Sequence, residues 1–143
     1  MFITNHVLSG AVIGLVAPGP GTALAVGVAS HFALDAAPHF GLDDLRLMQV
    51  AVPDGLVGLV AAALVTATAP SARRTSLLAG VFGACVPDLD KPGRVFFDRS
   101  PFPSWLDRFH SRIQNEAPGR FPVEVAAAIT LSAAFAVLAR RCR

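Results

Sequence analysis

Charged residues are scarce in this chain. Only 15% of its 143 residues are Asp, Glu, Lys or Arg, whereas a typical soluble domain has roughly 25%. Hydrophobic residues make up 53% of the sequence, and its mean hydropathy is +0.55. The charges lie in short clusters with long uncharged stretches between them, a pattern typical of membrane helices. We therefore expect a single helical membrane domain over residues 1–143, with an unusually apolar soluble helical bundle as the alternative.

Cysteine and basic residues are also few. Cys85 lies in an apolar run and Cys142 in the basic tail, and the two form no zinc-finger or CxxC spacing. A net charge of +2, without a basic run interleaved with aromatic residues, argues against nucleic acid as a partner. The N-terminal stretch "MFITNHVLSGAVIGLVAPGPG" lacks a basic n-region and a cleavage site. We therefore expect it to belong to the folded domain rather than to a signal peptide.

Five apolar segments predict a bundle of about five helices. They cover Phe2–Ala17, Thr22–Phe40, Val52–Ala69, Arg74–Val86 and Phe121–Ala139. Several are shorter than the roughly 20 residues that cross a bilayer upright. Their many Gly and Ala residues favour close helix packing, because small residues let backbones approach each other. Pro53 is expected in the first turn of the third helix.

The connection over residues 91–120 is the only long polar stretch. Within it, "SWLDRFHSRIQNE" predicts an amphipathic helix before the last segment, opened by a capping box between Ser104 and Asp107. Trp105, Phe109 and their apolar neighbours share one face of this helix. Such a face, with arginines beside it, suits the headgroup layer of a membrane. The alternative is a lid that simply packs on the bundle.

Polar residues gather at one end of the predicted bundle. If successive helices alternate in direction, the starts of the first, third and fifth segments meet the ends of the second and fourth. All ten acidic residues and all four histidines then fall at that end or in that half of the bundle. The candidates for a shared site are Asn5, His6, Asp35, His39, Asp54, Asp88, Asp90 and His110.

The stretch "SHFALDAAPHF", residues 30–40, is the densest part of this set. On a helix His31 and Asp35 lie one turn apart on the same face, and His39 follows four residues later. Ionisable groups inside apolar helices are costly and usually functional. Imidazole and carboxylate groups together suit zinc or a similar divalent ion. The "VPDLDK" motif adds Asp88 and Asp90 just past a helix end.

Each candidate also has a structural interpretation. His31 and Asp35 could form a buried pair that serves only packing, and His110 could be a solvated loop residue. Asp54 could be an ordinary first-turn acid, which the helix dipole favours. All of these interpretations would have to hold at one end of the bundle, so we favour a shared site.

Five short motifs follow one another along the chain: "NHVLSG", "SHFALDAAPH", "PDG", "PDLDK" and "FHSRIQ". Together they resemble a family of small bacterial inner-membrane proteins, the membrane-bound metal-dependent hydrolases, which includes the LexA-binding inner-membrane protein. The resemblance covers nearly the whole chain. A more distant similarity is to zinc-dependent phospholipase C and the S1/P1 nucleases, whose H-x3-D-x3-P-x-H pattern is similar to His31, Asp35, Pro38 and His39. Here the proline and the last histidine are adjacent.

The resemblance implies an all-α protein of the bacterial inner membrane that hydrolyses a phosphoester or similar bond in a lipid-like substrate. It implies a divalent metal ion, with zinc the first choice, that activates a water molecule. A carboxylate outside the ligand set, Asp54 or Asp90, would act as general base, with His110 as a further catalytic candidate. Arg108 or Arg112 would hold a phosphate. The implied metal ligands are His6, His31, Asp35, His39, Asp88 and Asp90.

Three functions are compatible with the sequence. The first is a membrane-embedded metal-dependent hydrolase. The second is a non-catalytic membrane protein whose polar cluster is structural or recruits a partner protein. The third is a small ion or proton translocator, which is disfavoured because a relay needs polar groups through the full depth of the membrane. The distribution of Lys and Arg does not decide which membrane face carries the site.

Overall fold

The expected helices form. The computed structural model describes residues 1–42 and 44–142, with the side chains of residues 44–48 outside the description. The apolar segments form α1 (Ile3–Val16), α2 (Pro20–Ala36), α3 (Asp44–Thr68), α4 (Arg74–Cys85) and α7 (Phe121–Arg141). Apart from an isolated bridge between His39 and Glu116, the regular structure of the described residues is helical. The all-α fold class is therefore confirmed.

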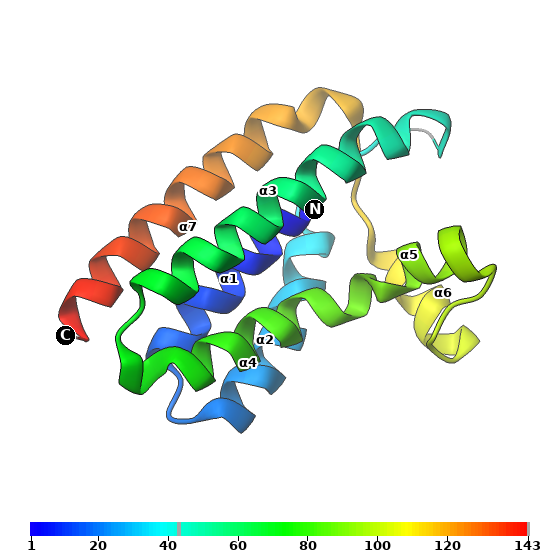
Figure 1. Ribbon diagram of the computed structural model, residues 1–143. Helices are drawn as coiled ribbons and strands as arrows, with labels where there is room; N and C mark the ends of the chain where they lie inside the picture. Colours follow the sequence, from blue (N-terminus) through cyan, green and yellow to red (C-terminus); the bar gives the residue numbers. More distant parts are fainter. Residues whose placement is uncertain (43, 143) are drawn as a thin grey trace.

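Helix α1 lies at the centre of the bundle. It packs against α2, α3, α4 and α7, and α2 and α4 also pack closely against each other (Figure 1). Leu8, Ala11 and Leu15 of α1 form the core with Leu77 of α4 and Phe135 of α7. Because α1 contacts every other long helix, its first turn is held from several sides.

Glycines allow α1, α2 and α4 to approach closely. A β-carbon on Gly10 or on Gly27 would lie 2.5 Å from the carbonyl oxygen of Gly80, and one on Gly80 would overlap the carbonyl oxygen of Gly10. No side chain fits at this crossing, so the backbones of the three helices are in direct contact. This confirms the close packing that the small residues predict.

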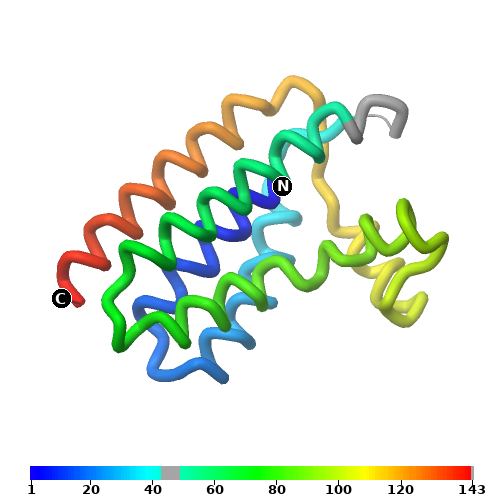
Figure 2. The backbone as a smooth tube through the Cα atoms, viewed as in Figure 1, coloured from blue at the N-terminus to red at the C-terminus, as the bar shows by residue number. Residues whose placement is uncertain are grey.

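The helices alternate in direction, as expected. Figure 2 shows the chain running back and forth along the bundle, so that α1, α3 and α7 begin where α2 and α4 end. We call this the polar end. The side chains of Asp43, Asp44 and Arg46, which the sequence also assigns to it, lie outside the described residues. The third helix begins earlier than expected, at Asp44, and Pro53 is inside it rather than in its first turn.

Beyond α4 the chain forms a small helical tip. A 3₁₀ turn, η2 (Val86–Leu89), leads into α5 (Asp90–Phe97), and α6 (Ser104–Ile113) follows. The sequence predicts α6 but not α5. The expected capping box is wrong: Ser104 is already inside the helix, and Asp107 instead accepts hydrogen bonds from Ser100 Oγ and Arg94. Figure 1 shows the tip, made of α5 and α6, projecting from the polar end.

Two helices are long and apolar enough to cross a membrane. These spans are Gln49–Thr68 and Pro118–Arg141, each with a mean hydropathy of 1.9 and 11% of the window buried. Their outward side chains are large and apolar, for example Leu59, 70% exposed, and Ile129, 65% exposed. The other three bundle helices have 14, 17 and 12 residues, which is short of the roughly 20 that span a bilayer.

Candidate metal centre

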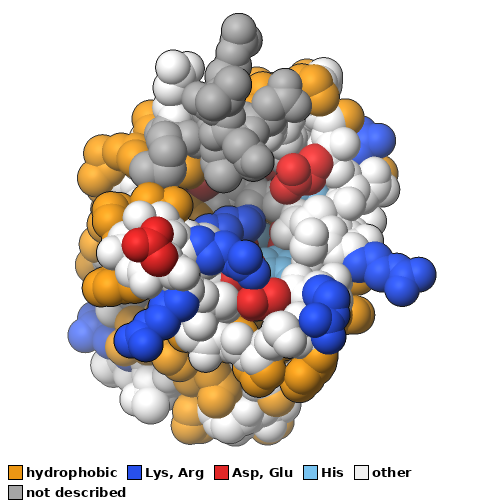
Figure 3. Space-filling view, turned by 90° about the vertical axis from the view of Figure 1, so that its right-hand side faces the viewer, with side chains coloured by type: hydrophobic (Ala, Val, Ile, Leu, Met, Phe, Trp, Pro, Cys, Tyr) orange, Lys and Arg blue, Asp and Glu red, His pale blue; other side chains and the backbone are white. Residues whose placement is uncertain are grey.

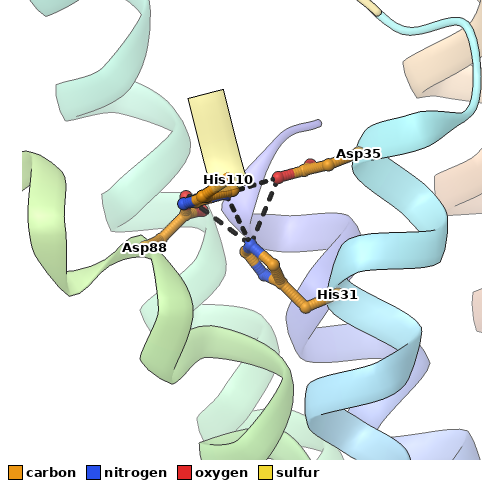
Figure 4. Close-up of side chains that lie close together, drawn as sticks. All are labelled: His31, Asp35, Asp88 and His110. Atoms are coloured by element: carbon orange, nitrogen blue, oxygen red, sulfur yellow. Dashed lines mark hydrogen bonds and ion pairs between the residues drawn. The ribbon is translucent and has the colours of Figure 1, made fainter. Parts of the chain in front are cut away.

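Four side chains meet at the polar end. His31 and Asp35 lie one turn apart on α2, Asp88 comes from η2, and His110 comes from α6 (Figure 4). One ligand atom from each lies within 4.8 Å of the others. We call these four residues the cluster. His31, Asp35 and His110 are buried, whereas the side chain of Asp88 is 12% exposed. The cluster is therefore closed on the bundle side and opens past Asp88.

Helix α6 reaches the cluster because a short strap ties it to α2. The backbone N–H of Asn115 donates to the carbonyl oxygen of Asp35, and the N–H of His39 donates to that of Asn115, each at 3.1 Å. Phe32 of α2 packs edge-on against the rings of Phe109 and His110. These contacts join residues that are about 75 positions apart in sequence.

A backbone contact fixes the tautomer of His31. Its Nδ1 lies 2.8 Å from the carbonyl oxygen of Ala84, and because a carbonyl can only accept, Nδ1 carries the proton. In the neutral ring, Nε2 is therefore a lone pair that points into the cluster. It lies 3.0 Å from His110 Nε2, 3.2 Å from Asp35 Oδ2 and 3.9 Å from Asp88 Oδ1. A lone pair that faces two carboxylates is stabilised by a cation between them.

Asp35 is the most heavily contacted member of the cluster. Its Oδ2 accepts hydrogen bonds from His110 Nε2 and Gln114 Nε2, both at 2.9 Å. Its Oδ1 accepts one from the amino group of Met1 at 2.7 Å and lies 3.2 Å from His6 Nε2. The negative charge of Asp35 thus holds α1, α2 and α6 together.

His6 is a neighbour of the cluster. Its ring stacks on that of His31, with the ring centroids 4.1 Å apart. Its Nε2 also lies 4.0 Å from Asp88 Oδ2, and both ring nitrogens lack a hydrogen-bond partner among the described residues. The structure therefore places a fifth imidazole or carboxylate donor beside the four.

Neighbouring charges shift the pKa values of His110 and Asp88 at the mouth of the cluster. Burial alone would lower the pKa of His110, but Asp35 and Asp90 raise it to about 9. Burial alone would raise the pKa of Asp88, yet the adjacent ammonium of Lys91, 2.7 Å away, holds it below its usual value. The carboxylates around His110 thus favour a positive charge at its ring, which a proton or a bound cation can supply.

The donor set fits a small divalent cation. A tetrahedral zinc site with bonds of about 2.0–2.1 Å has donor atoms about 3.3 Å apart. In the cluster, the distances from His31 Nε2 and His110 Nε2 to each other and to the carboxylates range from 2.9 to 3.9 Å. Nitrogen and carboxylate donors of this kind suit zinc, although they do not identify it.

Asp90 lies behind His110 rather than in the cluster. Its Oδ2 is 3.6 Å from His110 Nδ1, so it orients the ring with Nε2 toward Asp35. Its Oδ1 is buried and has no hydrogen-bond partner among the described residues. A carboxylate behind a ligating histidine is the usual arrangement in metal sites.

Asp54 has a structural role in this fold. Its carboxylate accepts hydrogen bonds from Ile3 N at 2.6 Å, Thr4 N at 3.3 Å and Thr4 Oγ1 at 2.6 Å. It thus caps the first turn of α1 from α3, because the cap residue Phe2 has no side chain able to do so. All three donors belong to α1, so in this fold Asp54 holds the start of that helix.

Glu124 of α7 completes this cap, and the sequence reasoning missed it. The side chain is 1% exposed and accepts from Phe2 N at 3.1 Å, Asn5 Nδ2 at 2.6 Å and Phe40 N at 3.1 Å. The available signal was a single acid near the start of an apolar segment. Gln114 was also missed, although it lies four residues after His110 on the same side of α6.

The structure does not bring His39, Arg108 or Arg112 to the cluster. The Nδ1 atom of His39 lies 2.9 Å from the carbonyl oxygen of Ala37, and its Nε2 lies 3.5 Å from Glu116. Arg108 and Arg112 are each two residues from His110 on α6, so they face the other way. They line a separate hollow at the tip.

Figure 3 looks onto the polar end. Basic and acidic side chains surround a hollow in which histidine surface is visible, and apolar side chains cover the flanks. The visible charge is therefore concentrated around the mouth of the cluster.

Comparisons with known proteins identify no relative of this chain. No protein-family model, curated protein or solved structure matches this chain.

Proposed function

We propose that this protein holds a divalent metal ion, zinc being the first choice, and hydrolyses a phosphoester or similar bond in a lipid-like substrate. The observation that supports the proposal is the cluster itself: two imidazoles and two carboxylates with ligand atoms within 4.8 Å. Buried ionisable groups are costly and are usually retained for function. Four of them converging at one point, open on one side, suit a metal centre.

The ligands would be His31, Asp35, Asp88 and His110, with His6 as a fifth donor. A bound divalent ion supplies a water of lowered pKa and polarises the bond to be cleaved. The chain's own contribution is orientation: the carbonyl of Ala84 turns Nε2 of His31 toward the site. Asp90 does the same for His110.

Asp90 is the better of the two expected candidates for a general base. Its Oδ1 has no hydrogen-bond partner among the described residues and its side chain is 14% exposed, so it can accept a proton from a group that reaches it past His110. Asp54 is committed to α1. Lys91, 43% exposed and paired with Asp88, is an accessible cation beside the cluster for a substrate phosphate, a role that the sequence assigned to Arg108 or Arg112.

A lipid-like substrate follows from the location that we propose. The outward apolar faces of α3 and α7 suit a multi-pass protein of the bacterial inner membrane. The polar end would then lie at one surface of the bilayer, where a lipid headgroup reaches the mouth of the cluster.

A non-catalytic role is the second candidate, and one observation favours it. Asp35 already receives hydrogen bonds from Met1, His110 and Gln114, so the cluster could serve as a structural link between helices. In this second role, the protein would act by recruiting a partner protein.

Metal content tests the two candidates. We expect the protein, purified in detergent without chelator, to carry about one zinc or similar ion per chain by elemental analysis. His31→Ala and Asp88→Asn should each lose it. His39→Ala is the matched control, because His39 is an equally buried histidine outside the cluster, and this variant should keep the metal.

Activity is the second measurement. Metal-loaded protein should hydrolyse a chromogenic phosphodiester. Asp90→Asn, assayed at saturating metal because Asp90 also orients His110, should lose most of the rate. A folded wild-type protein that holds no metal, and whose melting temperature does not change with added zinc, would contradict the proposal. Metal binding without hydrolysis of any phosphoester would favour the non-catalytic role, in which the cluster links the helices.

A further inference from the structure

The tip carries a hollow that the metal centre does not use. It has a volume of about 390 Å³ and is lined by Arg94, Ser104, Asp107, Arg108, Ser111 and Arg112. Arg94 is paired with Asp107 at 2.9 Å, whereas Arg108 and Arg112 are exposed and have no ion-pair partner among the described residues. The hollow therefore has an excess of two positive charges together with two hydroxyl groups.

This hollow is separate from the cluster. Four residues make slightly more than one helical turn, so Arg108 and Arg112 lie next to each other on one face of α6. His110, midway between them in sequence, lies on the opposite face and points at Asp35. Helix α6 thus holds the metal centre with one face and presents arginines with the other.

Large exposed aromatic side chains are close in sequence to residues that line the hollow. Trp105 precedes Arg108 on α6 and is 63% exposed, and Phe96 and Phe97 follow Arg94 on α5 and are 70% and 71% exposed. Exposed apolar rings beside arginines are costly in water but favourable in the headgroup layer of a bilayer. Arginine also matches the oxygens of a phosphate better than a point charge does.

We propose that this hollow binds the headgroup phosphate of an anionic phospholipid and so anchors the tip to the membrane surface. Arg108 and Arg112 contact the phosphate, Ser104 and Ser111 donate hydrogen bonds to its oxygens, and the aromatic rings enter the interface. The inference shares with the proposed function the location of α3 and α7 in a bilayer. It requires neither a metal ion nor hydrolysis.

The chain provides its own probe for this site. Trp105 is the only tryptophan in the sequence and follows Ser104, which lines the hollow, so its fluorescence should respond to binding there. The experiment titrates the full-length protein, in a neutral detergent, with phosphatidylglycerol, phosphatidylcholine of the same chain length, or inorganic phosphate. We expect a saturable blue shift with phosphatidylglycerol alone.

Two double variants test the assignment. Arg108→Gln/Arg112→Gln should bind phosphatidylglycerol roughly thirty-fold more weakly, since each basic residue at an anionic surface contributes about a fivefold factor. Arg140→Gln/Arg141→Gln removes the same charge at the far end of α7 and should bind as the wild type does. Circular dichroism checks that both variants are folded.

Several results would overturn the proposal. Equal binding of phosphatidylcholine would show that the arginines do not distinguish an anionic headgroup from a zwitterionic one. Equal loss in the Arg140/Arg141 variant would show an unspecific charge effect, and saturation by inorganic phosphate at matching concentrations would assign the hollow to a soluble anion. Because the titration is done without added metal or substrate, its failure would leave the hydrolase proposal untouched.

Discussion

At the scale of single residues, carboxylates with similar sequence settings have different tasks in this fold. Asp54 and Asp88 each follow a proline at a helix segment near the polar end. The first accepts hydrogen bonds from the start of α1, and the second joins the cluster. What separates them is the rotation of each helix about its own axis, which decides whether the side chain faces α1 or the interior of the site.

The cap on α1 gives a prediction for Asp54. Replacing it with alanine leaves the N–H groups of Ile3 and Thr4 without an acceptor, and we expect a loss of about 1–2 kcal/mol of stability. Metal content should not change. Asp54→Asn keeps one acceptor oxygen and should lose less. Thermal unfolding in detergent measures the first effect and elemental analysis the second; a metal-free but fully stable Asp54→Ala protein would assign the residue to the site instead.

Glu116 gives a prediction for pH. The imidazole of His39, whose Nε2 lies 3.5 Å from Glu116 Oε1, lowers the pKa of the Glu116 carboxyl below its usual value of 4.5. A carboxyl group whose pKa is depressed on folding stabilises the protein above its unfolded pKa, and this contribution is lost as the pH falls through the folded value. We expect Glu116→Gln to melt below the wild type at pH 7.

The difference between the two melting temperatures should begin to close as the pH drops below about 4.5, where the unfolded chain takes up the proton first, and should vanish once the pH is below the depressed pKa of the folded carboxyl. Glu116 is half-exposed, so the effect should be small. A difference that is constant between pH 7 and pH 3.5 would show that charge at this position does not matter.

At the scale of helices, the contact of three backbones at Gly80 sets the geometry of the site. Helix α1 carries His6, α2 carries His31 and Asp35, and α4 leads through η2 to Asp88. These side chains converge only because α1, α2 and α4 cross without side chains between them. The positions of these glycines therefore determine how closely the side chains of the cluster approach one another, although the glycines do not contact the cluster's ligand atoms.

Gly80→Ala tests this coupling. The added β-carbon meets backbone atoms of Gly10, which cannot rotate away, so we expect a loss of about 1–3 kcal/mol and weaker metal binding. Gly55→Ala in α3 is the matched control because its β-carbon meets nothing within 4 Å, and it should stabilise slightly. Equal effects of the two substitutions would mean that the crossing tolerates a side chain.

Much of the fold could be predicted at this scale, but less of the site. Long apolar segments and alternating direction indicate which helix ends meet, and this was enough to bring His31, Asp35, Asp88 and His110 to one end. Residues two positions apart on a helix lie on opposite faces. The assignment of Arg108 and Arg112 to a phosphate near His110 overlooked this. His39 could not be placed, because the pairing of its backbone with Asn115 depends on a contact distant in sequence.

At the scale of the whole molecule, a membrane protein and an apolar soluble bundle differ in what surrounds the exposed apolar faces of α3 and α7. Substitutions on these faces can therefore distinguish the two. Leu59 and Ile129 point outward near the middle of the two spans. In water, arginine at either position would cost little, since the side chain is already exposed. At the centre of a membrane helix, it costs about 2.5–3.5 kcal/mol.

We therefore expect Leu59→Arg and Ile129→Arg to reduce the amount of protein in the membrane fraction severalfold. Val16→Arg, at the end of α1 outside both spans and 59% exposed, should accumulate as the wild type does. Fractionation and immunoblotting measure this. Wild-type protein in the soluble fraction, with all three variants at equal levels, would support the soluble bundle.

The shared cap on α1 also bears on how the chain is completed during synthesis. The first helix is made early, but the acceptors for its initial N–H groups reside on α3 and on α7, near the other end of the sequence. Until Glu124 emerges and docks, Phe2 and Asn5 retain unsatisfied donors, which are costly once buried. A nascent chain halted before α7 thus differs chemically from a finished one, because the first turn of α1 still presents donors that only Glu124 satisfies.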